Sequence, residues 1–177
     1  MRRWLIASFG VAAVCGLLWF GQDRKTCVSR GGHRYVVGAT TPCNHAKLLD
    51  VMYRCQRVVL EGGDGPCIRR IRRRWDGSIH ELVDGGRAPA VTHGKKTVQV
   101  CLDGDPSTES LVFVVLHELA HVGCASVGHT PEFWTAFSSL LETAGRIGVY
   151  TEHDPTERVC GTEVGPGPPR VISTEIK

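Results

Sequence analysis

The chain has 177 residues, 42% of them hydrophobic, and a formal net charge of +3, so it is only mildly basic. This length accommodates one modest domain and an appendage. None of the eight cysteines lies in a CxxC pair, which argues against a zinc ribbon or an iron–sulfur cluster. Seven of them follow the apolar N-terminal segment. Because seven is odd, a fully disulfide-bonded monomer is excluded, whereas one or two disulfides and ordinary buried thiols both stay open.

The N-terminal appendage is an uncharged apolar run at residues 4–21, with basic residues on both sides. Its length is at the short end of the ~17–25 residues that span a bilayer, and Trp4 and Trp19 suit the membrane interface. We therefore predict that residues 1–25 form a single-pass transmembrane anchor. The alternative is a signal peptide cleaved near the small residues before Cys15, which would give a secreted or lumenal protein.

The segments that follow predict an α+β domain over residues 26–161. We expect a strand at 34–37, helices at 46–60 and 67–75, a loop at 78–89, and a β-hairpin of residues 90–92 and 97–102. Asp105 and Pro106 predict the N-cap and first turn of a helix that ends after about Ala125. Thr130 predicts the cap of a second helix, from Pro131 to about Ala144. Residues 162–177, rich in glycine and proline, predict a flexible tail.

The motif that carries chemistry is HELAH at residues 117–121. On a helix, side chains four residues apart share one face, so His117 and His121 can direct two imidazole nitrogens at one metal ion. A catalytic zinc usually takes three protein ligands, and His129 is the best third ligand because it follows a glycine-flanked turn and precedes a predicted helix. We therefore predict one Zn²⁺ per chain, although nickel, cobalt or manganese suits the same ligands.

Glu118 is rotated by about a quarter turn from both histidines on a helix with 3.6 residues per turn. Its predicted role is that of a general base, which accepts a proton from water and returns it to the leaving amine. Tyr150 and His153 follow the second helix and are weaker candidates for donors to an oxyanion. These residues together predict a zinc-dependent hydrolase that cleaves peptide bonds.

Residues 117–134 resemble the minimal zincin proteases of the WLM and SprT-like group, in which an HExxH helix is followed by a third histidine and a Phe-Trp pair. The similarity is closest to the short WLM-domain metallopeptidases of large DNA viruses. A strand before the motif helix, Tyr150, and the pair Cys160-Gly161 also match. The resemblance implies a zincin fold with ligands His117, His121 and His129 and catalytic Glu118. It adds a virion or a host-cell membrane as an expected location.

Five arginines gather in one short segment, at positions 69, 70, 72, 73 and 74. They are either the solvated face of a short helix or a patch that binds nucleic acid or anionic lipid. The second interpretation supports an alternative function, that of a membrane-tethered binding or structural protein with a vestigial metal site. A zinc-dependent amidase that acts on a non-protein substrate, such as a cell-wall peptide, is a third possibility. The predicted partners are therefore a protein or peptide substrate, a membrane through residues 4–21, and nucleic acid through Arg69, Arg70, Arg72, Arg73 and Arg74.

Overall fold

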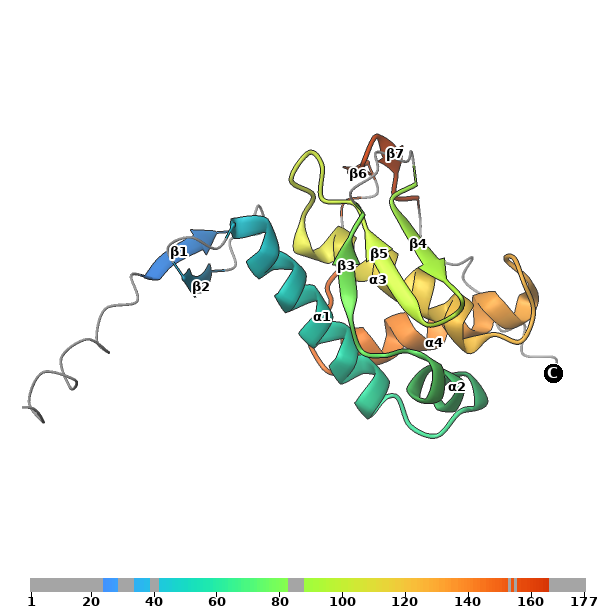
Figure 1. Cartoon of the computed structure of the whole chain (residues 1–177). Coiled ribbons are helices and arrows are strands. Elements are labelled where there is room, and N and C mark those ends of the chain that lie inside the picture. Colours follow the sequence, from blue (N-terminus) through green and yellow to red (C-terminus); the bar gives the residue numbers. More distant parts are fainter. Residues whose placement is uncertain are drawn as a thin grey trace, which may run out of the picture.

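The computed structural model of the chain describes residues 24–28, 34–38, 42–82, 88–152, 154 and 156–165. Within these residues the fold is α+β (Figure 1). The helices are α1 (Cys43–Glu61), α2 (Pro66–Arg74), α3 (Thr108–Gly123) and α4 (Pro131–Arg146). The strands are β1 (Arg24–Val28), β2 (Arg34–Gly38), β3 (Ile79–Glu81), β4 (Ala90–His93), β5 (Thr97–Val100), β6 (Arg158–Val159) and β7 (Thr162–Glu163).

Helix α3, which carries the HELAH motif, lies at the centre of the domain. It contacts α1, α2 and α4 as well as strands β4 and β5, and Figure 1 shows it behind the sheet formed by these strands. Because neighbours surround it, almost all of its side chains are buried, including Leu111, Leu116 and Leu119. Its burial fixes the motif in a rigid core, which favours a precise arrangement of the side chains that project from it.

The sheet beside α3 has the strand order β3-β5-β4. β4 and β5 form the predicted antiparallel hairpin, and β4 is at the edge of the sheet. β3 pairs in parallel with β5, so part of the segment that we expected to be a loop is a strand. The alternation in β3 is too short to detect from the sequence, and its pairing with β5 depends on tertiary contacts, including those with α1.

The ends of the two site helices differ in how well they were predicted. Thr130 caps α4 as expected, because its hydroxyl accepts a hydrogen bond from the backbone N–H of Phe133. The predicted cap of α3 at Asp105 is wrong. Ser107 caps this helix instead, accepting from the N–H of Ser110, while Asp105 adopts a left-handed φ of 52° in the preceding turn and pairs with the buried ammonium of Lys47.

Two disulfides attach outlying hairpins to the rest of the described fold. Cys27–Cys43 joins the β1–β2 hairpin to the first residue of α1, and Cys101–Cys160 joins the end of β5 to the β6–β7 hairpin. Beside the second disulfide, the Glu157 carboxylate accepts hydrogen bonds from Ser107 at the start of α3. Ordered structure continues past residue 161, since residues 162 and 163 form β7, while residues 166–177 lie outside the described part.

The predicted transmembrane anchor requires correction. Among the residues that the structure describes, no helix is both long enough and apolar enough to cross a bilayer. The predicted anchor itself, residues 4–21, lies outside the described residues. This finding conflicts with the predicted single-pass fold and membrane location, and we do not retain them.

Candidate metal centre

Three histidines, two from α3 and one from the loop that follows it, lie close together. His117 and His121 lie one turn apart on α3, and their ring centroids are 5.0 Å apart. His129 comes from the α3–α4 loop, and its Nε2 lies 3.0 Å from the Nε2 of His117. One nitrogen from each ring lies within 4.8 Å of the other two. Two ligands at about 2.0–2.1 Å from a tetrahedral zinc are about 3.3 Å apart, so this donor set fits one zinc ion after small side-chain rotations.

Phe133, in the first turn of α4, packs against all three imidazoles. Its ring stacks on His121 with a centroid distance of 4.4 Å, and its centroid lies 4.8 Å from His117 and 4.6 Å from His129. Burial by this apolar surface, together with the two neighbouring imidazoles, lowers the pKa of His117 to about 3. The ring is therefore neutral at physiological pH, as a metal ligand must be.

Glu118 points toward the β4 edge of the sheet. The hydroxyl of Thr92, on β4, donates a hydrogen bond of 2.6 Å to Oε2 of Glu118. Burial raises the pKa of the Glu118 carboxyl, and this hydrogen bond partly opposes the increase. A carboxylate whose pKa is raised toward neutrality is a better proton acceptor, which suits a general base.

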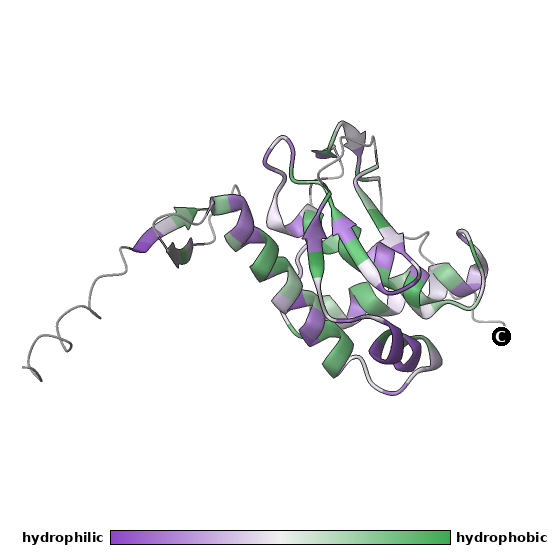
Figure 2. Cartoon of the chain, in the orientation of Figure 1, coloured by the Kyte–Doolittle hydropathy of each residue, from purple (hydrophilic) through white to green (hydrophobic). Residues whose placement is uncertain are grey.

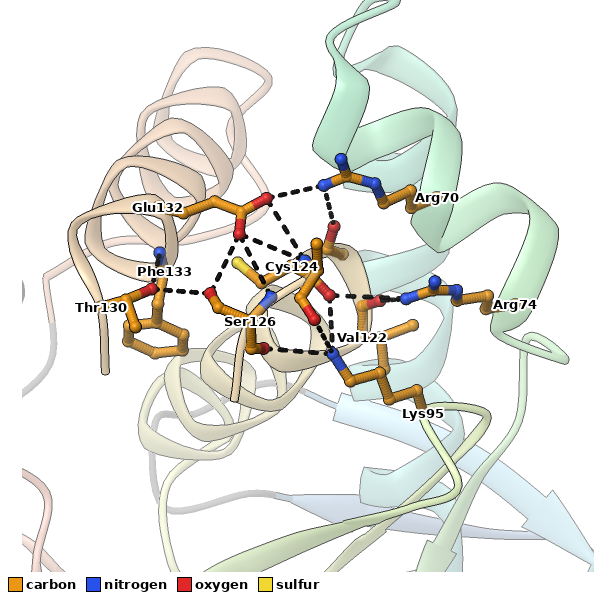
Figure 3. A network of polar contacts seen from close by, with 11 residues as sticks. Arg70, Arg74, Lys95, Val122, Cys124, Ser126, Thr130, Glu132 and Phe133 are labelled. Atoms are coloured by element: carbon orange, nitrogen blue, oxygen red, sulfur yellow. Dashed lines mark hydrogen bonds and ion pairs between the residues drawn. The ribbon is translucent and has the colours of Figure 1, made fainter. Parts of the chain in front are cut away.

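Glu132 binds backbone N–H groups of the loop that carries His129 (Figure 3). One carboxylate oxygen accepts hydrogen bonds from the backbone N–H of Ala125 and Ser126 and from the Ser126 hydroxyl, at 3.0 to 3.3 Å. The other oxygen pairs with Arg70 at 2.7 Å. These donors, first the amide of Ala125 and then Arg70, lower the pKa of Glu132 to about 2. The carboxylate therefore stays ionised and keeps its contacts with the loop across the physiological pH range.

Three cations hold the carbonyl groups on the other side of the same segment. Arg70 donates to the carbonyl of Gly123, and Arg74 donates to that of Val122 at 3.1 Å. Lys95, in the turn between β4 and β5, reaches the carbonyls that follow, beginning with Cys124 at 2.7 Å. Cations at a helix C-terminus also interact favourably with the helix dipole.

The arginine run on α2 is largely engaged within the protein. Besides Arg70 and Arg74, Arg72 donates to the carbonyls of Val59 and Leu60 and pairs with Asp64, whose carbonyl also accepts from Arg69. Arg73 is exposed. Figure 2 shows the whole helix as mostly hydrophilic, although Ile68 and Ile71 are buried in the core. Nucleic-acid binding through this run stays a prediction, with four of its five side chains already in contact with protein groups.

Of the two weaker candidates, Tyr150 is not part of the histidine cluster. The Tyr150 ring lies 6.5 Å from that of Phe113, and Tyr150 lines a polar cavity of about 300 Å³ together with residues of α1 such as Tyr53 and Arg54. His153 lies outside the described residues. Their predicted role as oxyanion donors stays a prediction.

Sequence reasoning missed four residues that shape the centre: Thr92, Lys95, Glu132 and Phe133. Phe133 is fully buried in the core, and its contact with the histidines was not foreseen. Glu132 stands in the first turn of a capped helix, a position that often contacts the preceding loop and could have signalled its role. Thr92 and Lys95 are distant in sequence, and only the packing of the hairpin against α3 brings them to the site.

Comparison with known proteins gives two short matches to viral proteins. The protein of Invertebrate iridescent virus 6 named "Uncharacterized protein 136R" is 39% identical over 71 residues, covering 36% of this chain and 40% of the viral protein. "Uncharacterized protein 042R" of Invertebrate iridescent virus 3 is 41% identical over 69 residues, covering 36% of this chain and 43% of its own length. The chain thus spans about two fifths of the length of these curated relatives. No family model and no solved structure matches the chain.

Proposed function

We propose that the protein is a zinc-dependent metallopeptidase of the WLM and SprT-like type. The observation that carries the proposal is the convergence of three imidazole nitrogens within 4.8 Å, with the carboxylate of Glu118 next to one of them in sequence. Three neutral nitrogen donors are the ligand set of many catalytic zinc sites, which leave a fourth position for water. A structural zinc site, by contrast, usually has four protein ligands, and the cluster among the described residues contains three.

In this proposal the chain's own residues bind the ion, move a proton and orient the substrate. A bound zinc would lower the pKa of water to about 7 and polarise the scissile carbonyl. Glu118 accepts the proton of the attacking water and transfers it to the departing amine nitrogen, so that no covalent bond forms between protein and substrate. The hydrogen bond from Thr92 holds the Glu118 carboxylate in one orientation before the proton is transferred.

The position of β4 supports an extended peptide as substrate. β4 is an edge strand of its sheet, and the side chain of Thr92 in β4 contacts Glu118. Edge strands present unpaired backbone N–H and C=O groups, to which an extended peptide can add as a further strand. This arrangement would place a peptide bond near the three histidines, and it favours a peptide over an unrelated amide as the substrate.

Metal content and hydrolysis of labelled casein by the full chain test the proposal together. We expect one zinc per chain, a large loss of zinc in His129→Ala, and loss of hydrolysis with zinc retained in Glu118→Gln. Glu142→Gln is a matched control, since Glu142 is an exposed glutamate on α4. Glu118→Gln that cleaves as fast as the parent would contradict the general-base role. A parent without zinc would contradict the metal centre, and the nucleic-acid-binding interpretation would then gain weight.

A further inference from the structure

Lys95 occupies an unusual position for a lysine. It follows Gly94 in the turn between β4 and β5, and its backbone has a left-handed φ of 55°, beside 58° at Gly94. Glycine, asparagine or aspartate adopts this conformation more readily than a lysine does. The Lys95 side chain is half-buried. Lysine is unfavourable in this backbone conformation, and yet the Lys95 side chain points toward the protein. This combination indicates that the side chain makes an interaction that offsets the backbone cost.

The ammonium group of Lys95 is surrounded by three consecutive backbone carbonyls. Its Nζ lies 2.7 Å from the oxygen of Cys124, 3.4 Å from that of Ala125 and 3.2 Å from that of Ser126 (Figure 3). These carbonyls follow the end of α3 and begin the loop that leads to His129. Backbone carbonyl oxygens beyond a helix end have no donors within the helix and need other hydrogen-bond donors. The Lys95 ammonium supplies three N–H donors for them.

The same short segment is held from both sides by groups of opposite charge. Glu132 accepts from the N–H groups of Ala125 and Ser126, while Lys95 donates to their carbonyls. Glu132 belongs to the helix that follows the loop, whereas Lys95 belongs to a different part of the chain. Lys95 therefore fixes the loop relative to the sheet, and the loop in turn fixes His129.

We infer that Lys95 is a positioning residue for the third metal ligand. The inference rests on the proposed function, because it presupposes that His129 binds the metal. The β4–β5 hairpin then has two contacts with the centre: Thr92 in β4 orients the general base, and Lys95 in the turn orients His129. One rigid element thereby sets the base and the third ligand relative to each other.

Zinc affinity of the full chain, measured by competition with a chromophoric chelator, tests this inference. We expect Lys95→Met to weaken zinc binding by about 10-fold, the usual effect of removing a residue that orients a ligand. Lys95→Arg, which keeps a cation with N–H donors, recovers most of the affinity. Lys96→Met is the matched control, since Lys96 is the exposed neighbour in the same turn, and it binds zinc like the parent.

A double-mutant cycle separates positioning from a general loss of stability. If Lys95 acts through His129, Lys95→Met has no further effect on zinc affinity in a His129→Ala background. Co²⁺ spectra of Lys95→Met provide a second readout, because they respond to the number and geometry of ligands. Two results overturn the inference and leave the metal centre intact. One is equal zinc affinity in Lys95→Met and the parent. The other is a loss of zinc affinity from Lys95→Met that is as large in the His129→Ala background as in the parent. A parent that binds no zinc overturns the proposed function and the inference with it.

Discussion

Gly123 lies where α2 packs tightly against α3, the helix that carries the HELAH motif. It is the last residue of α3, two positions after His121. A Cβ at this position would lie 2.2 Å from the Sγ of Cys67 and 3.1 Å from both the carbonyl oxygen of Cys67 and the Cγ1 of Ile71. The first distance is far below van der Waals contact, and Ile71 is fully buried. We therefore predict that Gly123→Ala forces α2 away from α3.

The magnitude follows from two opposing effects. Inserting a methyl group into a close-packed contact costs about 1–3 kcal/mol. Replacing glycine by alanine within a helix gains up to about 1 kcal/mol, and less at the last residue. The expected net loss is about 1–2 kcal/mol of unfolding free energy, measured by urea denaturation. Zinc affinity should fall as well, because α2 carries Arg70 and Arg74, which bind the carbonyls at the end of α3.

Gly145→Ala is the matched control for this prediction. Gly145 lies in α4, and a Cβ there would meet nothing within 4 Å, so this variant should gain about 0.5–1 kcal/mol. Cys67→Ala removes the nearest obstructing atom, and it should make Gly123→Ala less harmful than in the parent background. The steric reasoning is refuted if Gly123→Ala and Gly145→Ala shift stability in the same direction.

Three further predictions concern Thr92, His117 and the second disulfide. Thr92→Val should slow casein hydrolysis per bound zinc by about 10-fold, because it removes a hydrogen bond to the charged form of Glu118, whereas Thr92→Ser should retain the rate. In the folded protein the pKa of His117 is lowered from 6.5 to about 3, so below pH 6.5 the unfolded chain binds a proton that the folded chain does not. Unfolding free energy of the zinc-free protein should therefore fall by about 2 kcal/mol from pH 7.5 to pH 5, and identical urea midpoints at the two pH values would refute this. Replacing Cys101 and Cys160 by serine opens a link between residues 59 apart and should cost about 4 kcal/mol in the same assay, with no change expected if the thiols are unpaired in the parent.

The parts of the fold that local patterns determine were predictable. Thr130 and Pro131 predict the start of α4, and the alternation of side chains at residues 97–100 predicts β5. Both signals are local, because caps and side-chain periodicity depend only on residues near in sequence. The three histidines were predictable for the same reason. Two of them are fixed by helix geometry, and the third follows a turn too short to carry it far away.

The parts that failed depend on contacts between distant segments. Asp105 has the side chain of a good cap, yet Ser107 takes this role because Glu157, fifty residues later, binds its hydroxyl and its backbone N–H. β3 exists because β5 lies beside it, and no strand of three residues is apparent from its own pattern. The transmembrane anchor was inferred from local sequence features, namely an apolar run with flanking basic and tryptophan residues, and the described part of the chain has no helix that spans a bilayer.

His129, the proposed third ligand, depends on parts of the protein outside the HELAH motif. A helix holds His117 and His121 in place without help, but His129 stands on a loop of irregular backbone, whose polar groups no regular hydrogen-bond pattern satisfies. Here charged side chains from α2, α4 and the β4–β5 turn bind those groups, through Arg74, Glu132 and Lys95. Displacing α2, α4 or the β4–β5 hairpin should therefore lower zinc affinity, since each of these elements holds the loop that carries His129. Of the five arginines that suggest a binding surface in the sequence, Arg70 and Arg74 instead support, in the fold, the segment that leads to His129.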